Sequence, residues 1–311
     1  MIIIVFILYG ILLLWLFDFF ELKYNKDIEK KLNTSICIII NQVHNINDLI
    51  RTLDSIQYPN SNQNLELILI DISSDDMELI MQPYNNIFKS INIVRSENYD
   101  FDKSIIDSNN ILVLQNGIEL ANNFIDTLIQ HLDYSNMEIM IFSKINCTIN
   151  KKNIFTQIYA SFKQSIKSSL INKNIYNKID FNNECFLVGR DFFIENIDND
   201  INLNKANFKY IIQPNLYINT NKIDPWPTIF LAFYFPINLI YLFCIIIFIS
   251  KPDLILLISI VSKVFFELYL TYSYYNKLEI KFPKIEFCIY SIIIPFYILS
   301  EVLLIKRTLN K

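Results

Sequence analysis

The chain has 311 residues, a mean hydropathy of +0.30 and 52% hydrophobic residues, which allows a soluble domain together with a membrane part. Its three glycines lie far apart, and this excludes the Gly-rich phosphate loops of the Walker and Rossmann types. The net charge is −4: residues 227–311 hold eight basic and five acidic side chains, so the remainder carries −7. An acidic soluble part argues against nucleic-acid binding, which needs a basic face.

Residues 1–22 predict a transmembrane anchor. Ile2–Phe17 is an unbroken apolar run with a single glycine, close to the ~20 residues needed to cross a hydrocarbon core of ~30 Å. A cleaved signal peptide is the alternative, but no basic residue precedes the run, and bulky aromatic side chains occupy the place of small cleavage-site residues. Four lysines follow between residues 23 and 31, so the positive-inside rule predicts that the next segment is cytoplasmic.

The soluble part, residues 34–224, alternates short apolar runs with helical patterns. Five runs predict strands, at Ser35–Ile40, Leu65–Ile70, Ile91–Arg95, Ile111–Leu114 and Met137–Phe142. Helices are expected over Asn47–Gln57 with Asn47 as N-cap, from Asp76 to Met81, and over Leu120–Leu132. Because the strands are continuously apolar, we expect an α/β fold with a mostly parallel sheet covered on both faces by helices. Ligands of such sheets bind beyond the carboxyl ends of the strands.

Residues 227–311 predict about three C-terminal transmembrane helices, at Thr228–Ser250, Leu254–Tyr272 and Phe287–Ile305. Lys263 and Glu267 interrupt the second span but lie four residues apart on one helical face, where they could pair. Three lysines between the second and third spans predict a cytoplasmic loop. The basic tail then falls on the far side, so either the last segment is re-entrant or interfacial, or the tail is an exception to the rule.

The five cysteines are scattered and no two have CxxC spacing. This pattern excludes a zinc site built from paired cysteines and a disulfide framework. We therefore expect reduced, buried thiols at Cys37, Cys147, Cys185, Cys244 and Cys288.

Four segments of the soluble part carry a resemblance to a known family. They are Ser35–Ser55, with a strand and a Leu-rich helix; Gln57–Asp76, which keeps Tyr58-Pro59 and Asp71, Ser74 and Asp76; Leu114–Phe124, which keeps Leu120 and Phe124; and Cys185–Asp198, which keeps Gly189-Arg190 and Asp198. In this order and spacing they resemble motifs of the membrane-bound family 2 glycosyltransferases, of which the chain looks like a degenerate member. The resemblance covers roughly residues 34–220.

The resemblance implies an architecture and an activity. The architecture is an anchor at residues 1–22, a domain of GT-A fold at 34–224 and transmembrane helices at 227–311, with the soluble domain on the cytoplasmic side of a bacterial inner membrane. The activity is transfer of a sugar from a nucleotide sugar to a lipid or lipid-linked acceptor.

The resemblance also implies site residues. The family holds Mg or Mn against the sugar-nucleotide diphosphate with an Asp-x-Asp turn, but here the two acidic positions are Gln115 and Gly117, and no metal ligand is assigned. Asp200 is the candidate general base, with a solvated turn as the alternative. Nucleotide-sugar contacts are expected from Asp71, Ser74, Asp76, Gln115 and Asn116. The alternative for the first three is capping of the next helix.

Further departures from the family leave more than one function open. Ile72 replaces the second Asp of a pair, and the Gln-x-x-Arg-Trp motif is absent. Glu119 could replace a metal ligand, or it could point to solvent. The chain is then either an active membrane glycosyltransferase, or a catalytically inactive homologue that binds a membrane-protein partner or a lipid. An unrelated membrane protein with a cytoplasmic α/β domain is the third reading.

Overall fold

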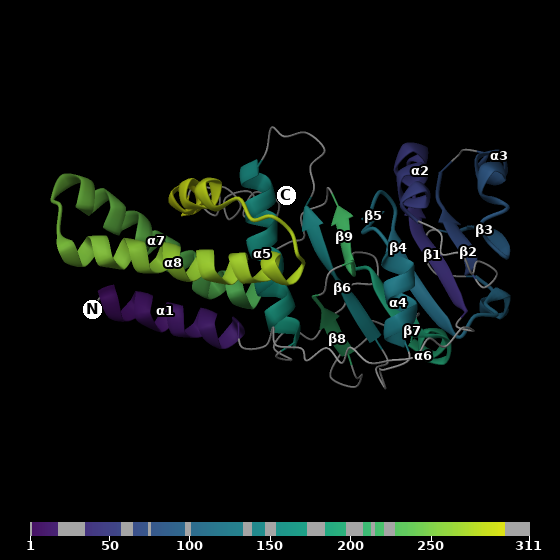
Figure 1. Ribbon diagram of the computed structural model, residues 1–311, viewed down its shortest axis with the longest axis horizontal. Helices are drawn as coiled ribbons and strands as arrows, with labels where there is room; N and C mark the ends of the chain where they lie inside the picture. Colours follow the sequence, from purple (N-terminus) through teal and green to yellow (C-terminus); the bar gives the residue numbers. More distant parts are fainter. Residues whose placement is uncertain are drawn as a thin grey trace, which may run out of the picture. The chain divides into compact units, whose positions relative to one another are not determined.

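The computed structural model describes residues 2–17, 35–56, 65–73, 76–96, 101–132, 139–146, 154–172, 184–196, 208–212, 215–220 and 228–295. The chain divides into two compact units. The helical unit comprises Met1–Leu22, Asn146–Lys173 and Ile223–Lys311, and the α/β unit comprises Lys23–Ile145 and Asn174–Lys222. Figure 1 colours both by sequence.

Within the described residues, nine strands of the α/β unit form one sheet with the order β3-β2-β1-β4-β7-β6-β9-β5, and β8 pairs with β6 (Figure 1). The strands are β1 (Ile36–Val43), β2 (Leu65–Asp71), β3 (Ser90–Arg95), β4 (Asn110–Gln115), β5 (Glu119–Leu120), β6 (Ile139–Asn146), β7 (Phe186–Gly189), β8 (Phe208–Ile211) and β9 (Tyr217–Thr220). All five strands expected from the apolar runs are present, and their observed starts differ from the expected ones by at most two residues and their ends by at most four.

The sheet is mixed rather than uniformly parallel. The pairs β1–β2, β1–β4 and β2–β3 are parallel, as the apolar runs indicated. Strand β7 lies antiparallel between β4 and β6. A four-residue apolar run such as Phe186–Gly189 fits a buried strand of either direction, so its sequence pattern carries no information about orientation.

Short helices flank the sheet, and two of them begin where the sequence pattern did not place them. Helix α2 (Ile46–Ser55) has Asn45 as its N-cap, whose side chain accepts from the Asn47 N–H at 2.9 Å, so the expectation of Asn47 was wrong by two residues. Helix α4 (Phe124–Leu132) begins four residues later than expected. Glu119–Leu120 instead pairs with β9 as strand β5. Helices α3 (Met77–Met81) and α6 (Arg190–Asn196) are shorter than α2 and α4.

The main core cluster of the α/β unit lies on one face of the parallel strands, where it takes alternate residues such as Ile36, Ile38 and Ile40. Leu49 and Leu53 of α2 and Phe124 and Leu128 of α4 join the inward side chains of β1, β2 and β4, and all of these are almost completely buried. The ring of Phe124 meets that of Phe142 edge-to-face at 5.0 Å between centroids. This packing fixes the strand ends, where polar residues gather.

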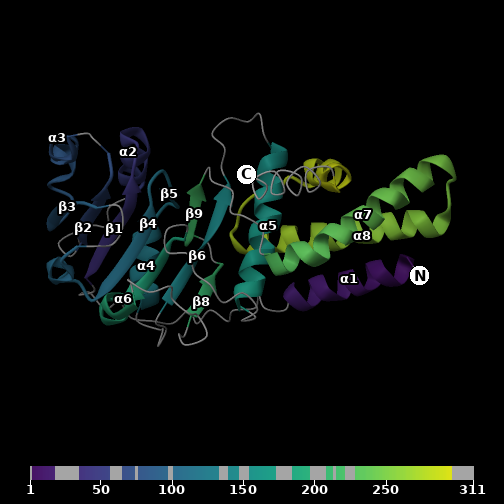
Figure 2. The same ribbon diagram turned by 180° about the vertical axis from the view of Figure 1, so that it is seen from behind.

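The helical unit consists of α1 (Ile2–Phe17), α5 (Ile154–Asn172), α7 (Thr228–Ser250), α8 (Leu254–Lys277) and the helical residues 284–295 (Figure 2). Helix α8 packs against α1, α7 and α5. Among the described residues, two helical stretches, Ala232–Ser250 and Leu254–Lys277, are long and apolar enough to cross a membrane, with mean hydropathies of 2.4 and 2.0. The apolar part of α1, Ile4–Trp15, is shorter.

Four cysteines lie among the described residues. Cys37, Cys185 and Cys244 are buried free thiols, as expected. The expectation of burial was wrong for Cys288, which is exposed within the helical residues 284–295. Burial raises the pKa of the Cys37 thiol well above its usual range, with the nearby Glu66 carboxylate as a second cause, so this thiol stays protonated and unreactive.

Candidate functional site

The carboxyl ends of β1, β2 and β4 bring together Asp71 and Gln115, which the sequence singled out, with Asn41 of β1. Asn41 of β1 is in register with Gln115 of β4, and Val43 of β1 is in register with Asp71 of β2. Asn41, Asp71 and Gln115 are each less than 5% exposed. Because parallel strands end at one edge of a sheet, three side chains distant in sequence become neighbours at a single edge.

Asp71 is the acidic side chain at this edge. Its Oδ1 accepts from the Ser73 N–H at 2.8 Å and from the Ser73 hydroxyl at 2.7 Å, which closes a tight turn after β2. Its Oδ2 is buried and has no hydrogen-bond partner among the described residues. The two bonds of Oδ1 go to Ser73 and not to the first turn of α3, so Asp71 is not a helix cap. One oxygen shapes the loop, and the other can accept from a ligand.

The turn Gln115-Asn116-Gly117 at the end of β4 is held by hydrogen bonds to α2 and to its N-cap residue Asn45. The Asn116 side-chain amide donates to the Asn45 carbonyl at 3.3 Å, and the Gly117 N–H donates to Thr52 Oγ1 at 3.0 Å. Asn116 Oδ1 is buried and has no hydrogen-bond partner among the described residues. The turn therefore presents amide groups in a fixed position.

Gly117 has a structural reason to be glycine. Its φ is +85°, a left-handed conformation that side-chain-bearing residues rarely adopt. A Cβ at this position would lie 3.1 Å from Asp48 Cγ and 3.3 Å from Asp48 Oδ2. An aspartate here would therefore be strained and would face another carboxylate.

The residues of this turn do not fit a divalent metal. A hard cation is held by carboxylates, but Gln115 and Asn116 offer neutral amide groups. Glu119, the possible replacement, lies in β5 with its carboxylate 3.5 Å from Arg51 Nε, and Arg51 also pairs with Asp48 at 3.4 Å. The Glu119 carboxylate is thus paired with Arg51 and does not point freely to solvent. In the part of the chain that the structure describes, no group of three His, Cys, Asp or Glu side chains could hold a metal ion.

The structure brings some of the expected site residues together and leaves others apart. Asp71, Gln115 and Asn116 share one sheet edge. Asp76 is exposed at the N-cap position of α3 and makes no side-chain cap hydrogen bond. Ser74 and Asp200 lie outside the described residues. Sequence reasoning missed Ser73 and Thr52, whose roles come from hydrogen bonds that no motif records.

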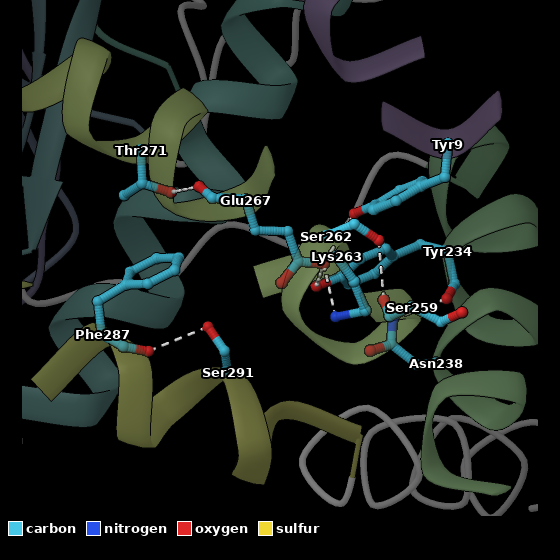
Figure 3. Close-up of polar contacts among 10 residues, drawn as sticks. All are labelled: Tyr9, Tyr234, Asn238, Ser259, Ser262, Lys263, Glu267, Thr271, Phe287 and Ser291. Carbon is cyan, nitrogen blue, oxygen red and sulfur yellow. Dashed lines mark hydrogen bonds and ion pairs between the residues drawn. The ribbon is translucent and has the colours of Figure 1, made fainter. Parts of the chain in front are cut away.

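A second polar cluster lies in the helical unit. Lys263 and Glu267 of α8 form the ion pair that their spacing predicted, with Lys263 Nζ 2.7 Å from Glu267 Oε1 (Figure 3). Both side chains are at most 1% exposed. Burying such a pair costs desolvation free energy that apolar residues of similar size would avoid, so its presence is not explained by stability alone.

No protein-family model matches this chain, and no curated protein does. Among the solved structures that this chain matches is S. aureus TarS 1–349 in complex with UDP-GlcNAc, at 10% identity and a TM-score of 0.39, covering 78% of this chain and 73% of that one. They also include the mannosyltransferase PcManGT from Pyrobaculum calidifontis in complex with GDP-Man and Mn²⁺, at 10% identity and a TM-score of 0.42, covering 90% of this chain and 86% of that one.

Proposed function

We propose that the chain is a membrane-bound, glycosyltransferase-like protein of GT-A fold that transfers a sugar from a nucleotide sugar to a lipid or lipid-linked acceptor at the cytoplasmic face of a bacterial inner membrane. The observation that carries the proposal is the free, buried Oδ2 of Asp71 at the carboxyl end of β2. A carboxylate oxygen in that position accepts hydrogen bonds from a nucleobase or ribose. The four sequence segments with family resemblance supply the reaction class.

The layout of the chain supports the membrane part of the proposal. Residues 1–22 are the anchor, residues 227–311 hold about three spans, and residues 34–224 are the sugar-nucleotide domain. The two long apolar helices α7 and α8 support this layout. The exposed side chains of α7 and α8 include many large apolar ones, among them Phe243, Ile249 and Phe265, which suit contact with lipid chains.

The proposed site uses this chain's own residues without a divalent metal. Asp71, with Ser74 and Asp76, binds the nucleoside, and Gln115 and Asn116 offer amide N–H donors to the diphosphate or sugar. Asp200 is the proposed general base that takes the proton of the acceptor hydroxyl. Neutral amides stabilise developing negative charge less than a metal ion does, so slow transfer is expected.

Calorimetry on the full chain in detergent tests the proposal, with UDP, GDP and their sugar conjugates as probes. Binding of one nucleotide is expected, unchanged when EDTA replaces Mn²⁺. Asp71→Asn is expected to weaken binding about tenfold, equivalent to about 1.4 kcal/mol, because a charged acceptor is lost. Asp191→Asn is the matched control, since Asp191 is exposed at the start of α6 and is not among the proposed site residues. Absence of binding, or strictly Mn²⁺-dependent binding, would contradict the proposed site.

A catalytically inactive homologue that serves as a membrane-protein partner is the second candidate. The geometry of Gly117 favours it, because the turn that carries the metal ligands in the family cannot accept an acid here without strain. Incorporation of radiolabelled sugar into membrane lipid distinguishes the two. Turnover that Asp200→Asn abolishes supports the enzyme. Nucleotide binding without turnover, together with a stably co-purifying membrane protein, supports the second candidate.

A further inference from the structure

Three helices of the helical unit converge on one carboxylate oxygen. Glu267 Oε1 accepts from the hydroxyl of Tyr9 on α1 at 2.8 Å and from the hydroxyl of Tyr234 on α7 at 3.2 Å, and it pairs with Lys263 one turn back on α8. Figure 3 shows Tyr9 and Tyr234 pointing toward this pair from their own helices. A single oxygen therefore takes three donors, deep among apolar side chains.

Several polar atoms of the same cluster have nothing to bind. Glu267 Oε2, Asn238 Oδ1 and the Tyr241 hydroxyl are buried and have no hydrogen-bond partner among the described residues. Asn238 uses its amide N–H on the Tyr234 carbonyl of its own helix, at 2.8 Å, which leaves the amide oxygen unused. Buried polar groups without partners are costly in an apolar surrounding. In native proteins an ordered water or another bound polar molecule is one way in which such groups are satisfied.

Lys263 supplies donors to the same place. An ammonium carries three N–H donors, and among the described residues Lys263 Nζ reaches only Glu267 Oε1 within ion-pair distance. It also lies 4.3 Å from the centroid of the Tyr241 ring, which stabilises the charge but accepts no strong hydrogen bond. The cluster thus combines unused acceptors with unused donors.

The charges of the cluster select the class of ligand. Lys263 and Glu267 cancel, so the site has no net attraction for an ion. The free oxygens of Glu267 and Asn238 repel a phosphate, and the Lys263 ammonium repels a metal or organic cation. A hydroxyl group both donates and accepts, and this matches the mixed set of free atoms. A neutral hydroxylated group is the chemistry that satisfies them.

We propose that the residues Asn238, Tyr241, Lys263 and Glu267 form a buried binding site for neutral hydroxyl groups between α1, α7 and α8. The hydroxyls come either from trapped water or from a lipid headgroup. This site does not depend on the proposed sugar-nucleotide function, because every residue belongs to the helical unit and none belongs to the strand-end site.

The water source is tested by X-ray hydroxyl-radical footprinting of the full chain in detergent. Radicals formed from trapped water oxidise the tyrosines beside it. Tyr9 and Tyr241 are expected to be oxidised despite their burial, whereas Tyr274, which is buried on α8 outside the cluster, is the dry reference. The variant Lys263→Met/Glu267→Leu should lower the oxidation of Tyr9 and Tyr241 several-fold.

The lipid source is tested in nanodiscs of phosphatidylcholine doped with monoglucosyl diacylglycerol, with retained lipids counted by native mass spectrometry. Selective retention of the glycolipid by the wild type is expected to fall to the phosphatidylcholine background in Asn238→Leu. Doping with phosphatidic acid instead of the glycolipid tests the excluded anion class.

Matched variants keep the result interpretable. Thr271→Val removes a buried hydroxyl from the same helix, one that bonds only the Glu267 carbonyl, and should change neither readout. Helicity by circular dichroism confirms folding, and replacing both charges together avoids leaving one buried and unpaired. If the wild type retains the glycolipid and Asn238→Leu does not, the hydroxyl groups in the site come from lipid. If the wild type retains no glycolipid, but oxidation of Tyr9 and Tyr241 falls in the double variant, they come from trapped water. Neither effect in the wild type, or preferential retention of phosphatidic acid, overturns the proposal.

Discussion

The Gly117 N–H donates to Thr52 Oγ1 at 3.0 Å, and the Thr52 hydroxyl in turn donates to the Asp48 carbonyl at 3.1 Å. One turn further along α2, Ser55 Oγ accepts from the Leu120 N–H at 3.0 Å. The segment after β4 is therefore fastened to α2 at two points. Its amide groups are held in place by hydroxyls whose identity no catalytic motif specifies.

Restoring an acid at position 117 should harm the protein. Gly117→Asp is expected to cost about 1–3 kcal/mol, because φ is +85° and the new side chain would approach Asp48. Hydrogen exchange at the Gly117 and Leu120 amides should accelerate, and Mn²⁺ binding should not appear. Gly189→Ala is the control, since a Cβ there meets nothing within 4 Å. Tight Mn²⁺ binding by Gly117→Asp would refute the account of the turn.

Glu66 is expected to stabilise the α/β unit through backbone groups rather than through its ion pair. Its Oε2 accepts from the N–H groups of Asp107 and Ser108, both at 3.2 Å, and its Oε1 lies 3.6 Å from the half-exposed Lys89. Glu66→Ala leaves those N–H groups without their acceptor and should cost about 1–3 kcal/mol. Lys89→Ala should cost less than about 1 kcal/mol.

Denaturant unfolding followed by proteolysis of the α/β unit measures both Glu66 and Lys89 variants. The structural assignment predicts a clear separation between them. Equal losses of stability in the two would mean that the ion pair, and not the backbone contacts, carries the effect.

The contribution of Tyr84 to stability should depend on pH. Burial raises the pKa of Tyr84 to about 12, and its hydrogen bond to Asp54, at 2.7 Å, acts in the same direction. Because the pKa in the unfolded chain is about 10, the contribution is fully present below that pH and is lost as the pH rises through about 12. The unfolding midpoints of wild type and Tyr84→Phe should therefore converge over this range. A difference that stays constant would rule out the linkage.

Gly10 should be indispensable for the packing of α1 on α8. A Cβ at this position would overlap the ring of Phe266, so Gly10→Ala forces the ring or the helix to move. The expected cost is about 1–3 kcal/mol, typical of overpacking. In a Phe266→Leu background the cost should shrink, and a double-mutant cycle of thermal midpoints in detergent measures this coupling. Additive effects would place the two residues apart.

Much of the fold follows from local sequence patterns. Helix α7 spans the predicted run Thr228–Ser250, and α1 covers the apolar run Ile2–Phe17, because uninterrupted runs of uncharged apolar residues predict helices. The pairing of Lys263 with Glu267 follows from their spacing alone. Helix α5 had no predicted counterpart, because its buried face holds Lys163 and Lys167. Lysines in a helical pattern predict a solvent-exposed face, but contacts of α5 with α1 and α8, which are distant in sequence, bury this face.

The candidate site likewise has features that the sequence predicts and features that it does not. The position of Asp71 and Gln115 at one sheet edge is predictable, since consecutive parallel strands end together. The left-handed turn at Gly117 and the use of Ser73 to orient Asp71 depend on side chains brought from elsewhere. The hydrogen bond from Tyr9 to Glu267 likewise joins residues 258 positions apart in the chain, whereas Tyr234 lies 33 positions from Glu267.

The placement of α5 between β6 and β7 governs the order in which the chain can fold during synthesis. Strand β7 lies between β4 and β6 in the sheet, yet it leaves the ribosome only after α5, which belongs to the other unit. Until then β4 and β6 expose edges that β7 alone covers. Assembly of the sheet therefore waits on a segment of the helical unit, and the nascent chain passes through a stage with unpaired strand edges.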